Sequence, residues 1–300
     1  MVGVVIYLTG ETERSKQSEK RRALQENIKQ NSYIRVGWQR DATETLGKFL
    51  AGKTVDEKLP YVLNGKQLKS QIEGFYGGTV INDGDTPLES FSFFNLSEED
   101  RKKGIFMMIY DQPEQFELRE FFRPLATLEV QQGLEEADYL LRAFAQPENY
   151  KMEPLQVYAI FKKQGDKLLL DWEVFTQTKY RTFQTFTELA VPNSKAVFRI
   201  LIVEDVPVKG LSMPGMRTYR LGDPANTGDS CRINVVVDSE VGRALSELNW
   251  RGTDTQPTPK TATVELEWSN DPENPILSIS RFICWEFLGV GGKVVPAKKP

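Results

Sequence analysis

Residues 154–189, PLQVYAIFKKQGDKLLLDWEVFTQTKYRTFQTFTEL, decide the fold of this chain. Two apolar runs, 155–161 and 168–174, flank the polar tetrapeptide QGDK at 164–167. Two strand-like runs joined by a short glycine-containing turn are typical of a β-hairpin. Gly165 suits the turn because glycine adopts positive φ without a steric cost. We therefore predict an antiparallel hairpin here.

The hairpin leads into an aromatic segment that has helical spacing. Tyr180, Phe183 and Phe186 lie at i, i+3 and i+6, so we expect them along one side of a short helix. Trp172 is expected in the second strand of the hairpin, facing a dry interior that is roofed by helices from earlier in the chain.

Apolar residues recur with helical spacing between residues 41 and 76. Asp41 is expected to cap a first helix, and Gly52 is expected to end it. Thr54 is followed three residues later by Glu57, which is the spacing of a capping box and predicts the start of a second helix. A third helix should end before Gly77.

Strand-like runs follow the turn-rich segment 82–87. Before the hairpin we predict strands at residues 88–96, 104–110, 116–122 and 125–131, and a further strand at 139–145, where the apolar residues also suit a helix. Helices that precede an antiparallel sheet indicate an α+β domain, with the helices packed on one face of a curved sheet.

The pattern changes after Pro192 and becomes rich in strands. We predict strands at residues 196–203, 217–221, 231–237, 261–268 and 277–287, with a helix at 239–248 that is capped by Asp238 or Ser239. Three strands, a helix and two strands is the element order of a small five-stranded β-barrel of the OB type. Several other small β folds share this order.

The expected domain organisation has four parts. These are a partial membrane anchor with a charged stalk, or a disordered arm (1–40), the α+β domain (41–190), the β-rich OB-like domain (191–292) and a polar tail (293–300). The apolar run 1–8 is shorter than the roughly 20 residues that span a bilayer. It is either an edge strand or disordered end, or the tail of a transmembrane helix that begins upstream of Met1.

Composition excludes several classes of function. The 300 residues are 40% hydrophobic with a net charge of −4, which suits a protein with a sizeable core. Residues 11–40 carry eight Lys/Arg and four Asp/Glu, a net charge of +4 that leaves −8 on the rest. An acidic body argues against nucleic acid as the main partner.

The chain has no histidine, which removes the commonest general base and the usual imidazole metal ligands. Cys231 and Cys284 lie in apolar runs, and the sequence leaves open whether they pair. Two thiols alone do not make a structural zinc site. We predict no metal and no cofactor.

Two acids in the hairpin are the candidate catalytic residues. In a strand, Asp171 and Glu173 project to the same face, where two carboxylates can share a proton and act as acid and base. In the alternative interpretation, Trp172 anchors the core and both acids face water or pair with Lys162 and Lys179.

Arg199 is a lone charge in an apolar strand. We expect a structural ion pair with Glu204 or Asp205, or else an anion-binding site centred on Arg199.

Several short motifs resemble one group of proteins. The runs Phe49-Leu50-Ala51, Thr54 and EKLPYV at 57–62, with Tyr76, resemble the opening of uncharacterised bacterial envelope proteins that are anchored by one N-terminal helix; Gly165, LLLDWE at 168–173 and Phe198-Arg199 resemble their later landmarks. The likeness covers residues 41–290. It implies an NTF2-like cone for the first domain and a truncated membrane anchor, and it assigns no activity and no functional residue.

From these observations we expect a non-enzymatic binding or scaffolding module at the bacterial cell envelope, with an unknown protein or small-molecule partner. A membrane-anchored, extracytoplasmic location is favoured, and a soluble cytoplasmic one is the alternative. The alternative function is a small-molecule or enzymatic pocket that uses Asp171 or Glu173. A second alternative is a ligand-binding barrel in the C-terminal domain, lined by Trp250, Trp268 and Trp285.

Overall fold

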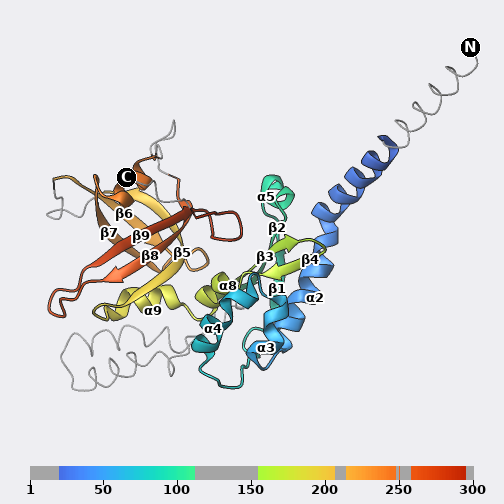
Figure 1. Cartoon of the computed structure of the whole chain (residues 1–300), viewed down its shortest axis with the longest axis horizontal. Helices are drawn as coiled ribbons and strands as arrows, with labels where there is room; N and C mark the ends of the chain where they lie inside the picture. The colour runs from blue at the N-terminus through green and yellow to red at the C-terminus, as the bar shows by residue number, and fades with distance from the viewer. Residues whose placement is uncertain (1–19, 112–154, 207–213, 248–249, 251–257, 295–300) are drawn as a thin grey trace, which may run out of the picture.

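The computed structural model describes residues 20–111, 155–206, 214–247, 250 and 258–294. They form helices and two antiparallel sheets, which confirms the predicted α+β class (Figure 1). The predicted anchor at 1–8, the strands at 116–122, 125–131 and 139–145, and most of the polar tail lie outside the described residues.

A long helix opens the described part of the chain. Residues 20–32 are helical, a π-helical turn η1 follows at Tyr33–Gly37, and α2 continues over Trp38–Ala51. The cap predicted at Asp41 is wrong, because helix already precedes it and its carboxylate instead accepts from the Arg40 guanidinium at 3.1 Å. Gly52 ends the helix as predicted. No helix among the described residues combines the length and the apolar character that crossing a bilayer needs.

The predicted capping box begins α3 (Val55–Lys58). The Thr54 hydroxyl accepts from the Glu57 N–H at 3.3 Å, and the Glu57 carboxylate accepts from the Lys53 N–H at 2.7 Å. A 3-10 turn η2 (Leu59–Tyr61) leads on to α4 (Gly65–Tyr76), which is the predicted third helix.

The first sheet has the order β1-β2-β3-β4. Its strands are β1 (Phe91–Phe94), β2 (Ile105–Asp111), β3 (Gln156–Gln164) and β4 (Lys167–Leu170). Gln164 pairs with Lys167 and Gly165 has φ +59°, which confirms the predicted hairpin. β1 is shorter than predicted because a 3-10 turn η3 (Leu88–Ser90) precedes it, and α5 (Glu98–Lys102) was not predicted.

The second sheet curls into a half-barrel with the order β7-β6-β5-β8-β9 (Figure 1). Its strands are β5 (Lys195–Asp205), β6 (Met216–Gly222), β7 (Ser230–Val236), β8 (Lys260–Trp268) and β9 (Leu277–Trp285). Ser239 caps α10 (Glu240–Ser246), so the predicted sequence of three strands, a helix and two strands is confirmed.

The segment after β4 differs from the prediction. The structure has two helices there, α8 (Trp172–Lys179) and α9 (Thr182–Leu189), so the strand predicted through Asp171 and Glu173 is wrong. The single helix predicted for the aromatic residues is also wrong, because Arg181 has φ +48° and separates α8 from α9. Tyr180 packs in the first core, whereas Phe183 and Phe186 pack in the second.

Three apolar clusters hold these elements together. The first lies between helices α2 and α4 and the first sheet, and it includes Trp38, Phe49, Ile72, Phe161 and Trp172. The second fills the curled sheet. The third packs the loop after β9 against the first sheet and α8, and consists of Leu63, Ile105, Met107, Ile160, Val174, Phe287 and Val290.

Trp172 is 2% exposed and faces α4, where its ring lies edge-on to Phe75, with centroids 5.4 Å apart. The early helices therefore cover this side chain, as expected. We call the first sheet with its helices the first unit, and the second sheet with α10 the second unit. The tryptophans of the second unit, Trp250, Trp268 and Trp285, pack in or against its core, and the Trp268 indole donates to the Phe186 carbonyl.

Candidate functional site

Helix α8 lies between the two sheets (Figure 1) and starts at a buried aspartate. Asp171 Oδ1 accepts from the backbone N–H groups of Glu173 and Val174, both at 3.1 Å. An aspartate at this position satisfies helix N–H groups that have no partner within the helix. This local hydrogen bonding ends β4 at Leu170 and explains why the predicted strand does not continue.

Three polar side chains follow one another at a spacing of four residues: Glu173 and Gln177 lie on one side of α8, and Arg181 lies in the link between α8 and α9. Each bonds to the second sheet or to the loop between β6 and β7. We call these three residues and their partners Arg199, Asp223 and Asp229 the α8 seam. It is the candidate functional site because it contains two of the predicted site residues and adjoins the third, Asp171.

Glu173 and Arg199 form the first contact of the seam. Arg199 Nη1 donates to Glu173 Oε1 at 3.0 Å, and Nη2 donates to Oε2, so the guanidinium forms a bidentate pair with the carboxylate. Arg199 is 1% exposed. Nη2 also lies 3.5 Å from the Leu288 carbonyl, which ties the loop after β9 to the same guanidinium.

The ion pairs predicted for Arg199 are wrong. Glu204 lies five residues along the same strand, about 17 Å away at the rise of a β-strand. It pairs with Arg217 at 3.9 Å, and Asp205 pairs with Arg232 at 2.8 Å.

Gln177 and Arg181 complete the seam. The Gln177 amide bonds the Arg199 backbone and also donates to Asp223 Oδ2 at 2.9 Å. Arg181 binds Asp229 with two hydrogen bonds, from Nε at 3.0 Å and from Nη2 at 2.6 Å. All four of these side chains are buried. The second sheet and its β6–β7 loop are therefore fixed to two successive turns of α8 and to the link between α8 and α9.

Burial raises the pKa values of two carboxyl groups at the seam, those of Asp171 and Asp223. Burial raises the pKa of Asp171 to about 6, and the Arg199 charge opposes this increase while the Glu173 charge adds to it. Asp171 Oδ2 and Arg199 Nε are both buried without a hydrogen-bond partner among the described residues. Burial also raises the pKa of Asp223, against the hydrogen bond from Gln177.

The seam thus brings Asp171, Glu173 and Arg199 into one cluster, although not in the arrangement expected from a strand. Asp171 serves as a helix cap and both oxygens of Glu173 are held by Arg199. The alternative prediction, that these acids pair with Lys162 and Lys179, is also wrong. Lys162 donates to the Lys103 carbonyl at 2.8 Å, and Lys179 belongs to a different cluster.

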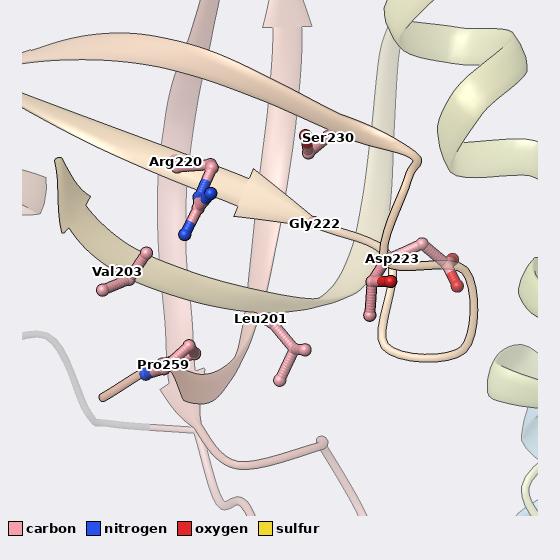
Figure 2. A pocket seen from close by; sticks show the side chains of 8 residues that line it. Leu201, Val203, Arg220, Gly222, Asp223, Ser230 and Pro259 are labelled. Atoms are coloured by element: carbon pink, nitrogen blue, oxygen red, sulfur yellow. The ribbon is translucent and has the colours of Figure 1, made fainter. Parts of the chain in front are cut away.

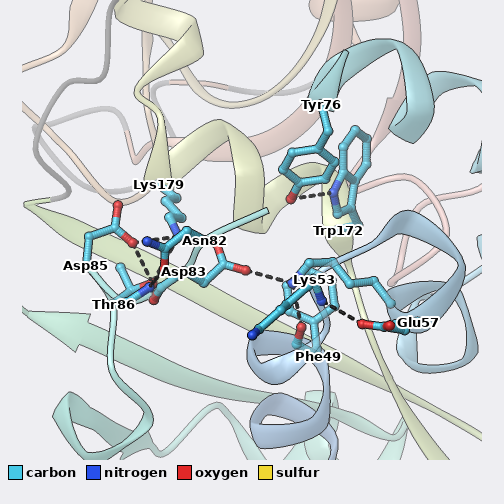
Figure 3. Close-up of polar contacts among 12 residues, drawn as sticks. Phe49, Lys53, Glu57, Tyr76, Asn82, Asp83, Asp85, Thr86, Trp172 and Lys179 are labelled. Carbon is cyan, nitrogen blue, oxygen red and sulfur yellow. Dashed lines mark hydrogen bonds and ion pairs between the residues drawn. The ribbon is translucent and has the colours of Figure 1, made fainter. Parts of the chain in front are cut away.

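That second cluster was missed from the sequence. Asp83, from the turn-rich segment 82–87, is buried and pairs with Lys58 at 2.7 Å and with Lys179 (Figure 3). Lys179 also pairs with Asp85 at 2.9 Å. Burial lowers the pKa of Lys58. No local pattern marks these residues, because 96 positions separate Asp83 from Lys179.

A small pocket of about 180 Å³ lies on the outer face of β5 and β6, beside the seam (Figure 2). It is lined by Leu201, Val203, Arg220, Gly222, Asp223, Thr227, Ser230 and Pro259. Asp223 belongs both to the pocket lining and to the seam, where its Oδ2 accepts from Gln177.

The structure also bears on metal ligands and thiols. Cys231 and Cys284 are free thiols, and burial raises the pKa of Cys231 to about 12. Within the described ranges, no three His, Cys, Asp or Glu side chains gather in a way that would hold a metal ion.

No protein-family model, curated protein or solved structure matches this chain. A function for it therefore has to rest on the seam, the pocket and the exposed surfaces.

Proposed function

We propose that this chain is a non-enzymatic binding or scaffolding module of the bacterial cell envelope, whose two sheet-containing units act as one body. The proposal rests on the contacts of Asp171 and Glu173, the two acids that were candidate catalytic residues. Glu173 gives both carboxylate oxygens to Arg199, and Asp171 gives one oxygen to two helix N–H groups. Both acids are therefore engaged in contacts that stabilise the fold.

The contacts between the units favour a stiff module. Two buried polar contacts and one partly buried one, between Glu173 and Arg199, follow α8 and its link to α9, and the apolar cluster around Phe287 and Val290 packs against α8. Buried charge pairs add little net stability but tolerate little change of geometry, because each partner that moves away leaves an uncompensated charge. Such a module presents surfaces on both units at a fixed separation.

We further propose an NTF2-like fold for the first unit and an OB-type barrel for the second. The packing of α2 and α4 on an antiparallel sheet supports the first assignment. A curled five-stranded sheet with α10 between its third and fourth strands supports the second. The envelope location rests on the resemblance of residues 41–290 to anchored envelope proteins.

The alternative is an enzymatic pocket that uses Asp171 or Glu173. The pKa of Asp171, raised to about 6, favours it, because general acids and bases act best near the working pH. The substitution Asp171→Asn separates the two proposals, because asparagine keeps the cap but cannot transfer a proton.

The pocket beside the seam favours a second candidate function, the binding of a small ligand by the barrel. The Arg220 guanidinium and the hydroxyls of Thr227 and Ser230 provide polar groups next to an apolar wall. Arg220→Gln should abolish ligand saturation in NMR titrations with small organic anions. Arg217→Gln, on the same strand but outside the pocket, should leave it unchanged.

The main proposal is tested by crosslinking in cells that express the full chain, followed by fractionation of the envelope. We expect the chain in the envelope fraction, in an adduct of defined higher mass that Asp171→Asn retains and Arg199→Met loses. Loss of the adduct with Asp171→Asn, at wild-type stability, would favour the enzymatic alternative. A chain that is found only as an uncrosslinked monomer would contradict the scaffolding function.

A further inference from the structure

We propose that residues 20–36 bind the surface of a membrane that contains anionic lipids, and so hold the acidic remainder of the chain away from that surface. This inference rests on the envelope location in the proposed function and names the partner of one segment. Three features of the helix support it, which are its charge, its exposed apolar side chains and its extension beyond the sheets.

The charge of the segment is opposite to that of the remaining chain. Residues 20–36 carry five basic side chains, Lys20, Arg21, Arg22, Lys29 and Arg35, and one acidic side chain, Glu26. Five minus one gives +4, and the whole chain has −4, so the rest carries −8. A basic segment next to an acidic body is complementary to an anionic surface and gives the attachment a direction.

These charges are available to a partner. All five basic residues are exposed. Within the described part of the chain, none of them forms an ion pair. Other exposed lysines of the protein do have acidic partners, such as Lys102 with Glu98 at 2.6 Å.

Apolar side chains distinguish a lipid surface from an acidic protein as the partner. Leu24 and Ile28 are 62% and 59% exposed and lie four residues apart, on one side of the helix. Val36 is 63% exposed at the other end of the segment. A helix with apolar residues among basic ones lies well at a membrane interface, where acyl chains and anionic headgroups are adjacent.

The extension of the helix prevents the acidic body from cancelling this attraction. Figure 1 shows the helix projecting away from both sheets. Residues 20–32 precede the turn at which Tyr33 and Ile34 pack against the first sheet and its neighbours. These thirteen helical residues span about 20 Å, whereas electrostatic interactions are screened over about 8 Å at physiological ionic strength. Lys20, Arg21 and Arg22 therefore reach an anionic surface while most of the acidic side chains remain beyond the screening distance.

The test is co-sedimentation of the full chain with vesicles of phosphatidylcholine, with or without one quarter phosphatidylglycerol. We expect binding to the anionic vesicles at low salt, at least a tenfold loss of affinity at high salt, and weak binding to phosphatidylcholine alone. Lys20→Gln/Arg21→Gln/Arg22→Gln should weaken binding on the order of 100-fold, since each basic residue contributes about fivefold. Glutamine is a good helix former, so the helix should persist.

The matched control removes the same charge elsewhere. Lys66→Gln/Lys102→Gln/Lys167→Gln alters three exposed lysines around the first sheet and should keep binding within about threefold of wild type. A second variant, Leu24→Gln/Ile28→Gln, should weaken binding several-fold without changing its salt dependence.

Three results would overturn the inference. They are equal losses in the two triple variants, equal binding to vesicles without phosphatidylglycerol, and equally tight binding to soluble polyglutamate, which would indicate an acidic protein partner. If vesicle binding fails while the crosslinked envelope adduct persists, the lipid inference is wrong and the scaffolding function stands. If the chain binds vesicles but forms no adduct, the lipid inference stands and the scaffolding function is wrong.

Discussion

The side-chain amide of Gln177 pairs with the backbone of Arg199 as a neighbouring strand would. Its nitrogen donates to the Arg199 carbonyl at 2.7 Å, and its oxygen accepts the Arg199 N–H at 2.9 Å. β6 pairs with β5 only from Leu201 onward, so this side of Arg199 has no strand beside it. The Gln177 side chain therefore makes the backbone hydrogen bonds that a neighbouring strand would make with Arg199, and it joins the two units at that point.

Gln177→Met should destabilise the protein by about 2–4 kcal/mol, because it leaves two buried backbone groups of Arg199 without partners at about 1–3 kcal/mol each. Urea denaturation measures the change. The matched control is Gln184→Met on α9. Gln184 is also buried, but its Oε1 has no partner among the described residues and its Nε2 donates only to the exposed Glu188 carboxylate at 2.8 Å, so this variant should change stability by less than about 1 kcal/mol. Equal effects of the two substitutions would contradict the role assigned to Gln177.

Asp171→Asn should stabilise the protein at pH 8 and have little effect at pH 4. The folded-state pKa of Asp171 is raised from 3.8 to about 6, so the ionised form is disfavoured by folding. The stability contributed by this group is present below pH 4 and is lost as the pH rises through 6. The difference in pKa of about 2 corresponds to ~3 kcal/mol at most.

Urea denaturation of wild type and variant at pH 4.5, 6 and 8 gives the measurement, because taking the difference cancels the other titrating groups. Asparagine is as good a helix cap as aspartate, so the cap is not lost. A variant that is less stable than wild type at pH 8 would show that Arg199 stabilises the Asp171 carboxylate by more than burial penalises it.

Asp83→Asn should destabilise the protein by about 3–5 kcal/mol, since it leaves the buried ammonium groups of Lys58 and Lys179 without their shared carboxylate. Thermal unfolding follows the loss. The control is Asp56→Asn, whose carboxylate pairs with Lys69 but is 77% exposed, and this should cost less than about 1 kcal/mol. If both variants lost the same small amount, the Asp83 cluster would not be a stabilising joint.

Phe287→Ala should cost about 3 kcal/mol, because Phe287 fills the third apolar cluster between the loop after β9 and the first sheet. Limited proteolysis should then cut the loop sooner than in wild type. Phe94→Ala, at a side chain that is 45% exposed, is the comparison and should leave the cleavage rate unchanged.

Local chemistry explains which parts of the fold could be predicted. The hairpin needs only Gly165 and its flanking runs, and the start of α3 needs only Thr54 and Glu57. Both signals lie within a few residues of the element they specify. The five strands of the second sheet likewise follow from short runs in which apolar residues stand together or alternate with polar ones.

The errors arose where two local signals compete or where partners are far apart in sequence. The run LLLDWEV alternates like a strand but also contains an aspartate that can cap a helix, and the cap determines the structure. Arg199 was expected to pair within its own strand, yet Glu173 lies 26 positions away on α8. Lys58, Asp83 and Lys179 meet only once α3, the segment after α4 and α8 are packed together.

The central claim is that the Glu173–Arg199 pair couples the two units, and a double-mutant cycle with Glu173→Met and Arg199→Met tests it most directly. Arg199→Met alone should cost about 3 kcal/mol, and the double variant should recover part of that loss, because the unpaired carboxylate is gone. The predicted coupling free energy is about 2 kcal/mol. A coupling below about 0.5 kcal/mol, as for exposed ion pairs, would contradict the claim that this pair joins the units.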